Sequence, residues 1–203
     1  MTNSPIRAVF AFALSLVGAV PQAAAFGLTD VITAPATLVE RAVEARGASD
    51  IAADNEIVIK INGIMAEYTT IKASTEIYEQ RLLMTGLFDD KATYDGFQKK
   101  VKQVPGVKKL YWHVYYMSDA DQEKNKAKLI SWDDALVLDT KVGANLVGTR
   151  GIADVNFRVT VDSYGSVFLL GRARSQEEKD KAVQVARQTS GVRKVVSYVD
   201  VRP

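Results

Sequence analysis

The chain has 203 residues, of which 47% are hydrophobic and 25% charged, and its formal net charge at pH 7 is +2. These are the values of an ordinary globular protein with enough apolar residues for two small cores, and they exclude a disordered chain. A nearly neutral total argues against non-specific nucleic-acid binding as the main function. The sequence contains no cysteine, so a disulfide framework is excluded and each core is expected to be held by packing alone.

Residues 1–25 have the three parts of a secretory signal. A short positive segment ends at Arg7, 13 apolar residues follow from Ala8 to Val20, and Ala23-Ala24-Ala25 is an A-x-A cleavage site. Thirteen apolar residues are too few to span a bilayer as a helix. We predict a periplasmic protein cleaved after Ala25; the alternative is a hydrophobic helix kept in the mature chain. Without a thiol to carry a lipid, any membrane attachment is expected to be peripheral.

Residues 26–48 are predicted to form a connector containing one helix from Pro35 to Arg46, and residues 49–118 a first domain. That domain is expected to open with a helix that places three isoleucines at core spacing. A hairpin, a crossing helix and a closing strand follow, with Pro105-Gly106 separating the last two. The predicted ranges are Asp50 to Met65, Thr69 to Gln80, Arg81 to Phe88, Asp89 to Gln103 and Val107 to Met117.

Residues 119–130 are polar and lack an apolar period, so they are predicted to be a short linker before a second domain at residues 131–203. Ser131 is a good N-cap for the helix that opens this domain. Ser175, followed three residues later by Glu178, is a capping box for its second helix, and Gly191 can take the left-handed position that ends it. The predicted strands are residues 155–161, 167–171 and 192–201, with a turn at residues 162–165.

The two predicted domains repeat one pattern at a spacing of 85 residues. Gly86 corresponds to Gly171, and Gly106 to Gly191, within elements of the same type. Agreement at two glycine turns, a strand glycine and a helix face indicates a duplication. The predicted class is α+β: two αββαβ units, each a three-stranded mixed sheet covered by two helices.

At Leu170-Gly171, at Ser190-Gly191-Val192 and in the valine-rich last strand, the second unit resembles a BON domain; Asp50 to Val114 resembles a more divergent copy. The resemblance implies two tandem BON domains behind a signal peptide, similar to dual-BON outer-membrane lipoproteins and to osmotically inducible periplasmic BON proteins. It further implies a non-enzymatic protein that binds anionic phospholipid, or an envelope protein partner, and supports envelope integrity. The chain differs from the lipoprotein type because it lacks the lipid-carrying cysteine.

The helix from Ser131 to Val147 carries more apolar surface than one small sheet needs. Beside the expected core face, a second arc contains Trp132, Leu136, Gly143 and Val147. Two covers for this arc remain open: the first domain, or a membrane surface with Lys126, Lys128, Lys141 and Arg150 supplying charge. The resemblance adds Val137, Thr140 and Lys141 as counterparts of the family's phospholipid-contacting positions. The candidate lipid-binding set is therefore Trp132, Leu136, Val137, Thr140, Lys141, Gly143 and Val147. The competing function is a soluble protein-interaction or osmotic-stress-protective module without lipid affinity.

The sequence offers little for catalysis, a metal or a cofactor. His113 is the only histidine and lies within a predicted strand, where a structural role is expected. Asp90 and Asp133 stand where helices begin, so capping explains them. A second group of basic residues, Lys99, Lys100, Lys102, Lys108 and Lys109, is read as a solvated face with lipid contact as the alternative. The closing strand has one face with Tyr111, His113 and Tyr115 and another with Trp112, Val114 and Tyr116. One of the two faces must be core, and the other could dock the linker, the other domain or a partner.

Overall fold

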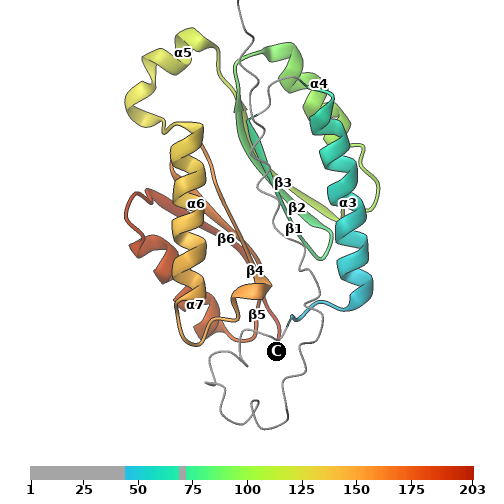
Figure 1. Ribbon diagram of the computed structural model, residues 1–203, viewed down its shortest axis with the longest axis vertical. Helices are drawn as coiled ribbons and strands as arrows, with labels where there is room; N and C mark the ends of the chain where they lie inside the picture. Colours follow the sequence, from blue (N-terminus) through green and yellow to red (C-terminus); the bar gives the residue numbers. More distant parts are fainter. Residues whose placement is uncertain (1–43, 69–71) are drawn as a thin grey trace, which may run out of the picture. The chain divides into compact units, whose positions relative to one another are not determined.

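A computed structural model describes residues 44–68 and 72–203 (Figure 1). The predicted signal and nearly all of the connector lie outside the described residues. Of the predicted connector helix, residues 44–46 are described, and they are not helical. All elements below belong to one compact unit, Ala36–Pro203.

The first repeat has the predicted order of helix, strand, strand, helix, strand. Its opening helix buries Ile57 and Ile61, as expected, and the second helix begins at the N-cap Asp90, whose carboxylate accepts a hydrogen bond from the Thr93 amide at 2.7 Å. This confirms the capping role of that aspartate. The elements are α3 (Ala48–Ala66), β1 (Ala73–Tyr78), β2 (Arg81–Phe88), α4 (Lys91–Val101) and β3 (Lys109–Tyr116).

The second repeat has the same order. Ser131 caps its first helix by accepting from the Asp134 amide, and Ser175 caps its second helix by accepting from the Glu178 amide, so both predicted N-caps are confirmed. The Glu178 carboxylate accepts from the Arg174 and Ala153 amides, which is not the bond to the Ser175 amide that a capping box predicts. Gly191 has φ +99°, the left-handed conformation expected after that helix. The elements are α6 (Trp132–Val147), η2 (Asp154–Asn156), β4 (Phe157–Val161), β5 (Ser166–Ala173), α7 (Gln176–Gln188) and β6 (Lys194–Val201).

Each repeat folds into a three-stranded mixed sheet, in the orders β1-β2-β3 and β4-β5-β6. In both, a hairpin is antiparallel and the last strand joins its second strand in parallel, as predicted. The parallel registers coincide at the 85-residue spacing: Gly86 pairs with Val114, and Gly171 with Val199. A Cβ on either glycine would lie too close to a carbonyl oxygen of the neighbouring strand segment, at 2.5 Å and 2.0 Å respectively. Both glycines are therefore required by the same close backbone approach.

The first hairpin is held by an aspartate on α3. Glu79 and Gln80 both have positive φ, the backbone of a two-residue type I′ turn, although neither is glycine. The buried Asp54 carboxylate accepts hydrogen bonds from both of their amides, at 2.9 Å and 2.6 Å, and pairs with Arg46 at 2.8 Å. These charge-assisted bonds offset the cost of the unusual backbone.

The structure adds detail to the predicted linker and moves the start of one predicted strand. The stretch predicted as a short polar linker contains a short helix, α5 (Asp119–Lys124), and a 3-10 turn, η1 (Lys126–Lys128). Ser118 caps α5 by accepting from the Asp121 amide, a local signal that the missing apolar period concealed. Val155, predicted as the first strand residue, lies instead in η2, because the backbone at Asn156 approaches Gly171 before the strand begins.

Each repeat has its own hydrophobic core between its sheet and its two helices. A third cluster lies between the repeats, on the faces of the two sheets that carry no helix. Thr85 and Thr160 touch there at 2.9 Å between hydroxyl oxygens, and the Tyr111 and Tyr198 rings stack at 3.8 Å. The layer order is therefore α3 and α4, first sheet, second sheet, α6 and α7, which can be followed in Figure 1.

Candidate functional site: the outer face of α6

Helix α6 covers the second sheet with one face and presents the opposite face to solvent. Four side chains at helical spacing, Ala135, Leu138, Val142 and Leu146, are buried in the core of the second repeat. This is the predicted core face, and it fixes the rotation of the helix about its axis. The remaining residues of α6 are therefore the ones available for contacts outside the repeat.

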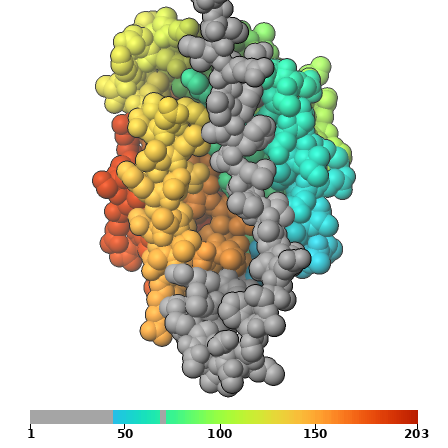
Figure 2. All heavy atoms as spheres, in the orientation of Figure 1, coloured from blue at the N-terminus to red at the C-terminus, as the bar shows by residue number. Residues whose placement is uncertain are grey.

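The exposed side of α6 begins with two acids, Asp133 and Asp134, and continues with a short stripe that carries no charge. Val137 and Val147 are 51% and 42% exposed, and Thr140 and Ala144 between them are also exposed. These residues, spaced by three or four positions, form one stripe, here called the α6 ridge: Val137, Thr140, Ala144 and Val147. The surface of α6 appears in yellow to orange in Figure 2. A helix buried on one side and carrying such a stripe on its solvent side has a surface suited to a second apolar phase or partner.

The predicted contact residues divide into two groups around this ridge. Val137, Thr140, Lys141 and Val147 are exposed, whereas Trp132, Leu136 and Gly143 are partly buried. A Cβ added to Gly143 would meet no atom within 4 Å, so no close packing requires a glycine there. Three residues of the arc predicted from helical spacing are therefore partly buried. The most exposed large apolar side chain of the helix, Val137, lies beside that arc.

Basic side chains flank the α6 ridge. Lys128, Lys141 and Arg150 are exposed and take part in none of the ion pairs found among residues 44–68 and 72–203, whereas Lys126 pairs with Glu123 at 3.5 Å. Exposed pairs of this kind are weak and screened by salt. Beyond the acidic first turn with Asp133 and Asp134, the surface around α6 therefore combines apolar atoms with three cations that form no ion pair among the described residues.

The first repeat was one of the two surfaces expected to bury the second apolar arc of α6. It instead meets the second repeat through strands β1 and β2 against β4 and β5, on the sheet face opposite to α6. The buried contact consists of Tyr78, Leu83, Phe168 and Leu170, with Tyr111, Val196 and Tyr198 around them. Because these contacts use the sheets, the α6 ridge stays exposed.

One side of α6 nevertheless comes near the first repeat and carries an unusual carboxyl. Burial raises the pKa of Asp139 to about 7. Burial, reinforced by the negative charge of Asp139, raises the pKa of Glu76 on β1 to about 8, while Arg158 acts in the opposite direction. Asp139 is the counterpart of Asp54 at the 85-residue spacing. In the second hairpin, the Asp162 carboxylate accepts hydrogen bonds from the Tyr164 and Ser166 amides. The turn of this hairpin is therefore held by Asp162, and Asp139 does not have the role that Asp54 has in the first repeat.

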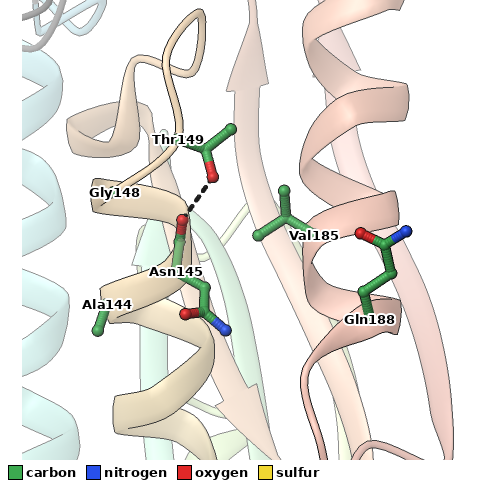
Figure 3. Close-up of a pocket in the computed structure, with 6 residues that line it drawn as sticks. All are labelled: Ala144, Asn145, Gly148, Thr149, Val185 and Gln188. Carbon is green, nitrogen blue, oxygen red and sulfur yellow. Dashed lines mark hydrogen bonds between the residues drawn. The ribbon is translucent and has the colours of Figure 1, made fainter.

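A shallow pocket of about 340 Å³ lies between the end of α6 and α7 (Figure 3). The Asn145 amide donates to the Thr189 hydroxyl at 2.8 Å, and the Thr149 hydroxyl donates to the Asn145 carbonyl oxygen at 2.6 Å. Its polar groups are thus largely engaged with one another, and no charged side chain lines it. The lining residues are Ala144, Asn145, Gly148, Thr149, Val185 and Gln188. This pocket by itself does not define a ligand.

The sequence missed how the repeats are joined. His113 stacks on Phe168 at 4.0 Å, and its Nε2 lies 2.8 Å from the Tyr198 hydroxyl. Burial lowers the pKa of His113. The Arg81 guanidinium donates to the carbonyl oxygens of Gly171 and Tyr198 at 2.8 Å and 2.9 Å. The alternation of Tyr111 and His113 with Trp112 did predict that one face of β3 would be core and the other a docking face, and the structure confirms this.

Among the described residues, no group of three or more histidine, cysteine, aspartate or glutamate side chains is placed to hold a metal ion. Within the same residues, no helix combines the length and hydropathy that a membrane span requires.

In a comparison with known proteins, residues 134–203, within the second repeat, match the BON domain family model. A protein of Anaplasma centrale described as "Uncharacterized protein in gshII 5'region" is 27% identical over 156 residues, covering 73% of this chain and 95% of that protein. Two solved structures of CdsD, a structural protein of the type III secretion system of Chlamydia trachomatis, are also similar. They share 14% and 16% identity, cover 73% of this chain and 93% and 98% of theirs, and have TM-scores of 0.29 and 0.28.

Proposed function

We propose that this protein is a non-enzymatic periplasmic module that binds anionic phospholipid headgroups through the outer face of α6 and supports the integrity of the cell envelope. The observation that carries the proposal is the α6 ridge, with Val137 and Val147 about half exposed next to Lys128, Lys141 and Arg150, which form no ion pair with any residue that the structure describes. The BON domain matched at residues 134–203 supports it, because some members of that family bind phospholipid.

We further propose that the first repeat is a divergent second BON domain. The shared order of elements, the coincident parallel registers and the two strand glycines at the 85-residue spacing support a common origin of the two units. The chain would then contain two BON domains in tandem, and the α6 ridge would meet a membrane through surface contacts.

The expected affinity is low. Each of three cations near an anionic surface contributes about 1 kcal/mol, and partial burial of Val137 and Val147 adds about 1 kcal/mol each. The sum corresponds to a dissociation constant on the order of 0.1 mM in accessible lipid. Binding should therefore be reversible and should weaken steeply between about 0.1 M and 1 M salt, as the Debye length falls from about 10 Å to about 3 Å.

Co-sedimentation with vesicles tests this function. The protein should sediment with vesicles containing phosphatidylglycerol at low salt and stay in the supernatant with purely zwitterionic vesicles. Lys141→Glu and Val147→Asp should each reduce the bound fraction. Ile59→Asp is the matched control, since Ile59 is an exposed apolar helix residue, 71% accessible, on the first repeat.

Failure of the wild-type protein to sediment with anionic vesicles at low salt would refute the lipid function. It would favour the alternative, a soluble protein-interaction or stress-protective module in which the α6 ridge meets an envelope protein. Equal loss of binding in Ile59→Asp and Val147→Asp would show that α6 is not the contact surface.

A further inference from the structure

A second basic surface lies on the first repeat, at the end of α4 and the start of β3. The sequence between Asp95 and Asp119 contains five lysines and no acidic residue. All five lysines are exposed. Lys100 pairs with Glu67, and the other four form no ion pair within residues 44–68 and 72–203. The Lys109 ammonium lies over the Tyr111 ring at 4.9 Å, on the sheet face that meets the second repeat. The other three, Lys99, Lys102 and Lys108, are here called the α4 patch.

The α4 patch and the α6 ridge face opposite directions. Helix α4 packs on the first sheet on the face away from the second sheet, and α6 packs on the second sheet on the face away from the first. The two helix layers therefore lie on opposite sides of the paired sheets (Figure 1). Sheets stack about 10 Å apart, and a helix layer on each side adds about 10 Å, so the two outer surfaces are separated by on the order of 30 Å.

This separation means that one flat membrane cannot contact both surfaces. At physiological salt, electrostatic attraction is largely screened beyond about 8 Å. A membrane held by the α6 ridge leaves the α4 patch too far away to take part in the same contact. The three lysines of the α4 patch, which form no ion pair within the described part of the chain, can then meet a second anionic surface.

The contacts between the repeats keep this arrangement fixed. Arg81 is nearly buried and binds two carbonyl oxygens of the second repeat, and Tyr78 donates to the Asn156 side chain at 3.1 Å. Together with the stacked rings of Tyr111 and Tyr198, they prevent the repeats from turning their helix layers toward the same side. A flexible linker would allow the two domains to rotate about a hinge, but the packed interface between them resists that rotation.

From this arrangement we propose that the protein bridges two anionic phospholipid surfaces, one held by the α6 ridge and the other by the α4 patch. The proposal rests on the proposed lipid function for the first contact, and on the charge and orientation of the α4 patch for the second. Because the patch is basic but lacks an apolar ridge, its contact is mainly electrostatic and is the more salt-sensitive of the two.

Clustering of vesicles, measured by dynamic light scattering alongside co-sedimentation, tests the bridge. Vesicles of about 30 mol % phosphatidylglycerol should both bind the intact protein and cluster at low salt. The double variant Lys99→Glu, Lys102→Glu should keep most of its binding and cluster vesicles about tenfold more slowly. The control is Lys72→Glu, which reverses the charge of an exposed lysine on the same repeat outside the patch, one that forms no ion pair within residues 44–68 and 72–203, and this variant should cluster vesicles like the wild type.

The outcomes separate the two proposals. No sedimentation of the wild type with anionic vesicles refutes the lipid function, and the bridge with it. Sedimentation without clustering, or clustering that is unchanged in the α4 patch variant, leaves lipid binding intact and overturns the bridge. Val147→Asp should reduce both binding and clustering; clustering by this variant at the wild-type rate also overturns the bridge.

Discussion

Replacing Asp139 by asparagine should stabilise the protein at alkaline pH. The carboxyl is partly buried on α6, and its pKa is about 7 in the folded chain against an ordinary value of 3.8. Because the folded state holds the proton more tightly than the unfolded state, the contribution of Asp139 to stability is complete below about pH 4 and is lost as the pH rises through about 7. An asparagine removes this loss.

The size of the effect follows from the difference between the two pKa values. At about 1.4 kcal/mol per pKa unit the difference corresponds to about 4 kcal/mol. Solvent reaches part of the side chain, so we expect about half of this, ~2 kcal/mol at pH 8. For a chain of this size, that raises the melting temperature by about 4–8 °C. The gain should be about 1 kcal/mol smaller at pH 5, where the wild-type carboxyl is still protonated in the folded state.

Thermal unfolding followed by circular dichroism at pH 5 and pH 8 measures this gain. Asp133→Asn is the control, since Asp133 is an exposed carboxylate in the first turn of the same helix; its loss should cost at most about 1 kcal/mol, because acids are favourable at a helix N-terminus. If Asp139→Asn melts at or below the wild-type temperature at pH 8, or if its gain is the same at both pH values, the assignment of a buried, protonated Asp139 is wrong.

Three further predictions concern the strand glycine, the interface histidine and the interface arginine. Gly171→Ala should destabilise the protein by about 3 kcal/mol or more, because its Cβ would overlap the Asn156 carbonyl oxygen. Gly143→Ala in α6 should instead stabilise the protein by up to about 1 kcal/mol. Urea unfolding compares the two variants, and equal effects on the free energy of unfolding would contradict the packing argument. The ring of His113, the single histidine, should titrate by NMR with a midpoint below the ordinary value of 6.5, so its contribution to stability is lost as the pH falls below about 6.5; a midpoint at or above that value would contradict its burial. Arg81→Ala should cost about 2–4 kcal/mol, because two carbonyl oxygens of the second repeat lose their donor; unfolding that is as stable and as cooperative as the wild type would show that the interface does not depend on it.

Local signals in the sequence predicted the fold of each repeat well. The N-caps Ser131 and Ser175, the helix-ending Gly191 and the alternation along the strands all act within a few residues of the chain, so they specify helices and turns without tertiary information. The repeated pattern supplied the rest, since units that match at Gly86 and Gly171 were expected to share one sheet topology, and they do. The α5 helix was missed because it is capped by polar residues and carries no apolar period.

The candidate site was only partly predictable. Helical spacing gave the core face of α6 and predicted a second apolar arc beside it, but spacing cannot tell which side of a helix a neighbouring domain approaches. In the structure, Trp132 and Leu136 are partly buried, and Val137 and Val147 are exposed. Likewise, the counterparts Asp54 and Asp139 look identical in sequence, and only the folded hairpins show that one carboxylate holds a turn while the other has no turn to hold.

The sequence by itself determined that this is one small αββαβ unit used twice, because caps, turns and strand alternation are properties of short segments. Only the tertiary structure decided that the two sheets stack face to face and that the helix layers point in opposite directions. The reason is physical: the side chains that join the repeats, such as Arg81, Tyr111 and Tyr198, meet partners about 90 residues away, and no local pattern encodes which surface such residues will find.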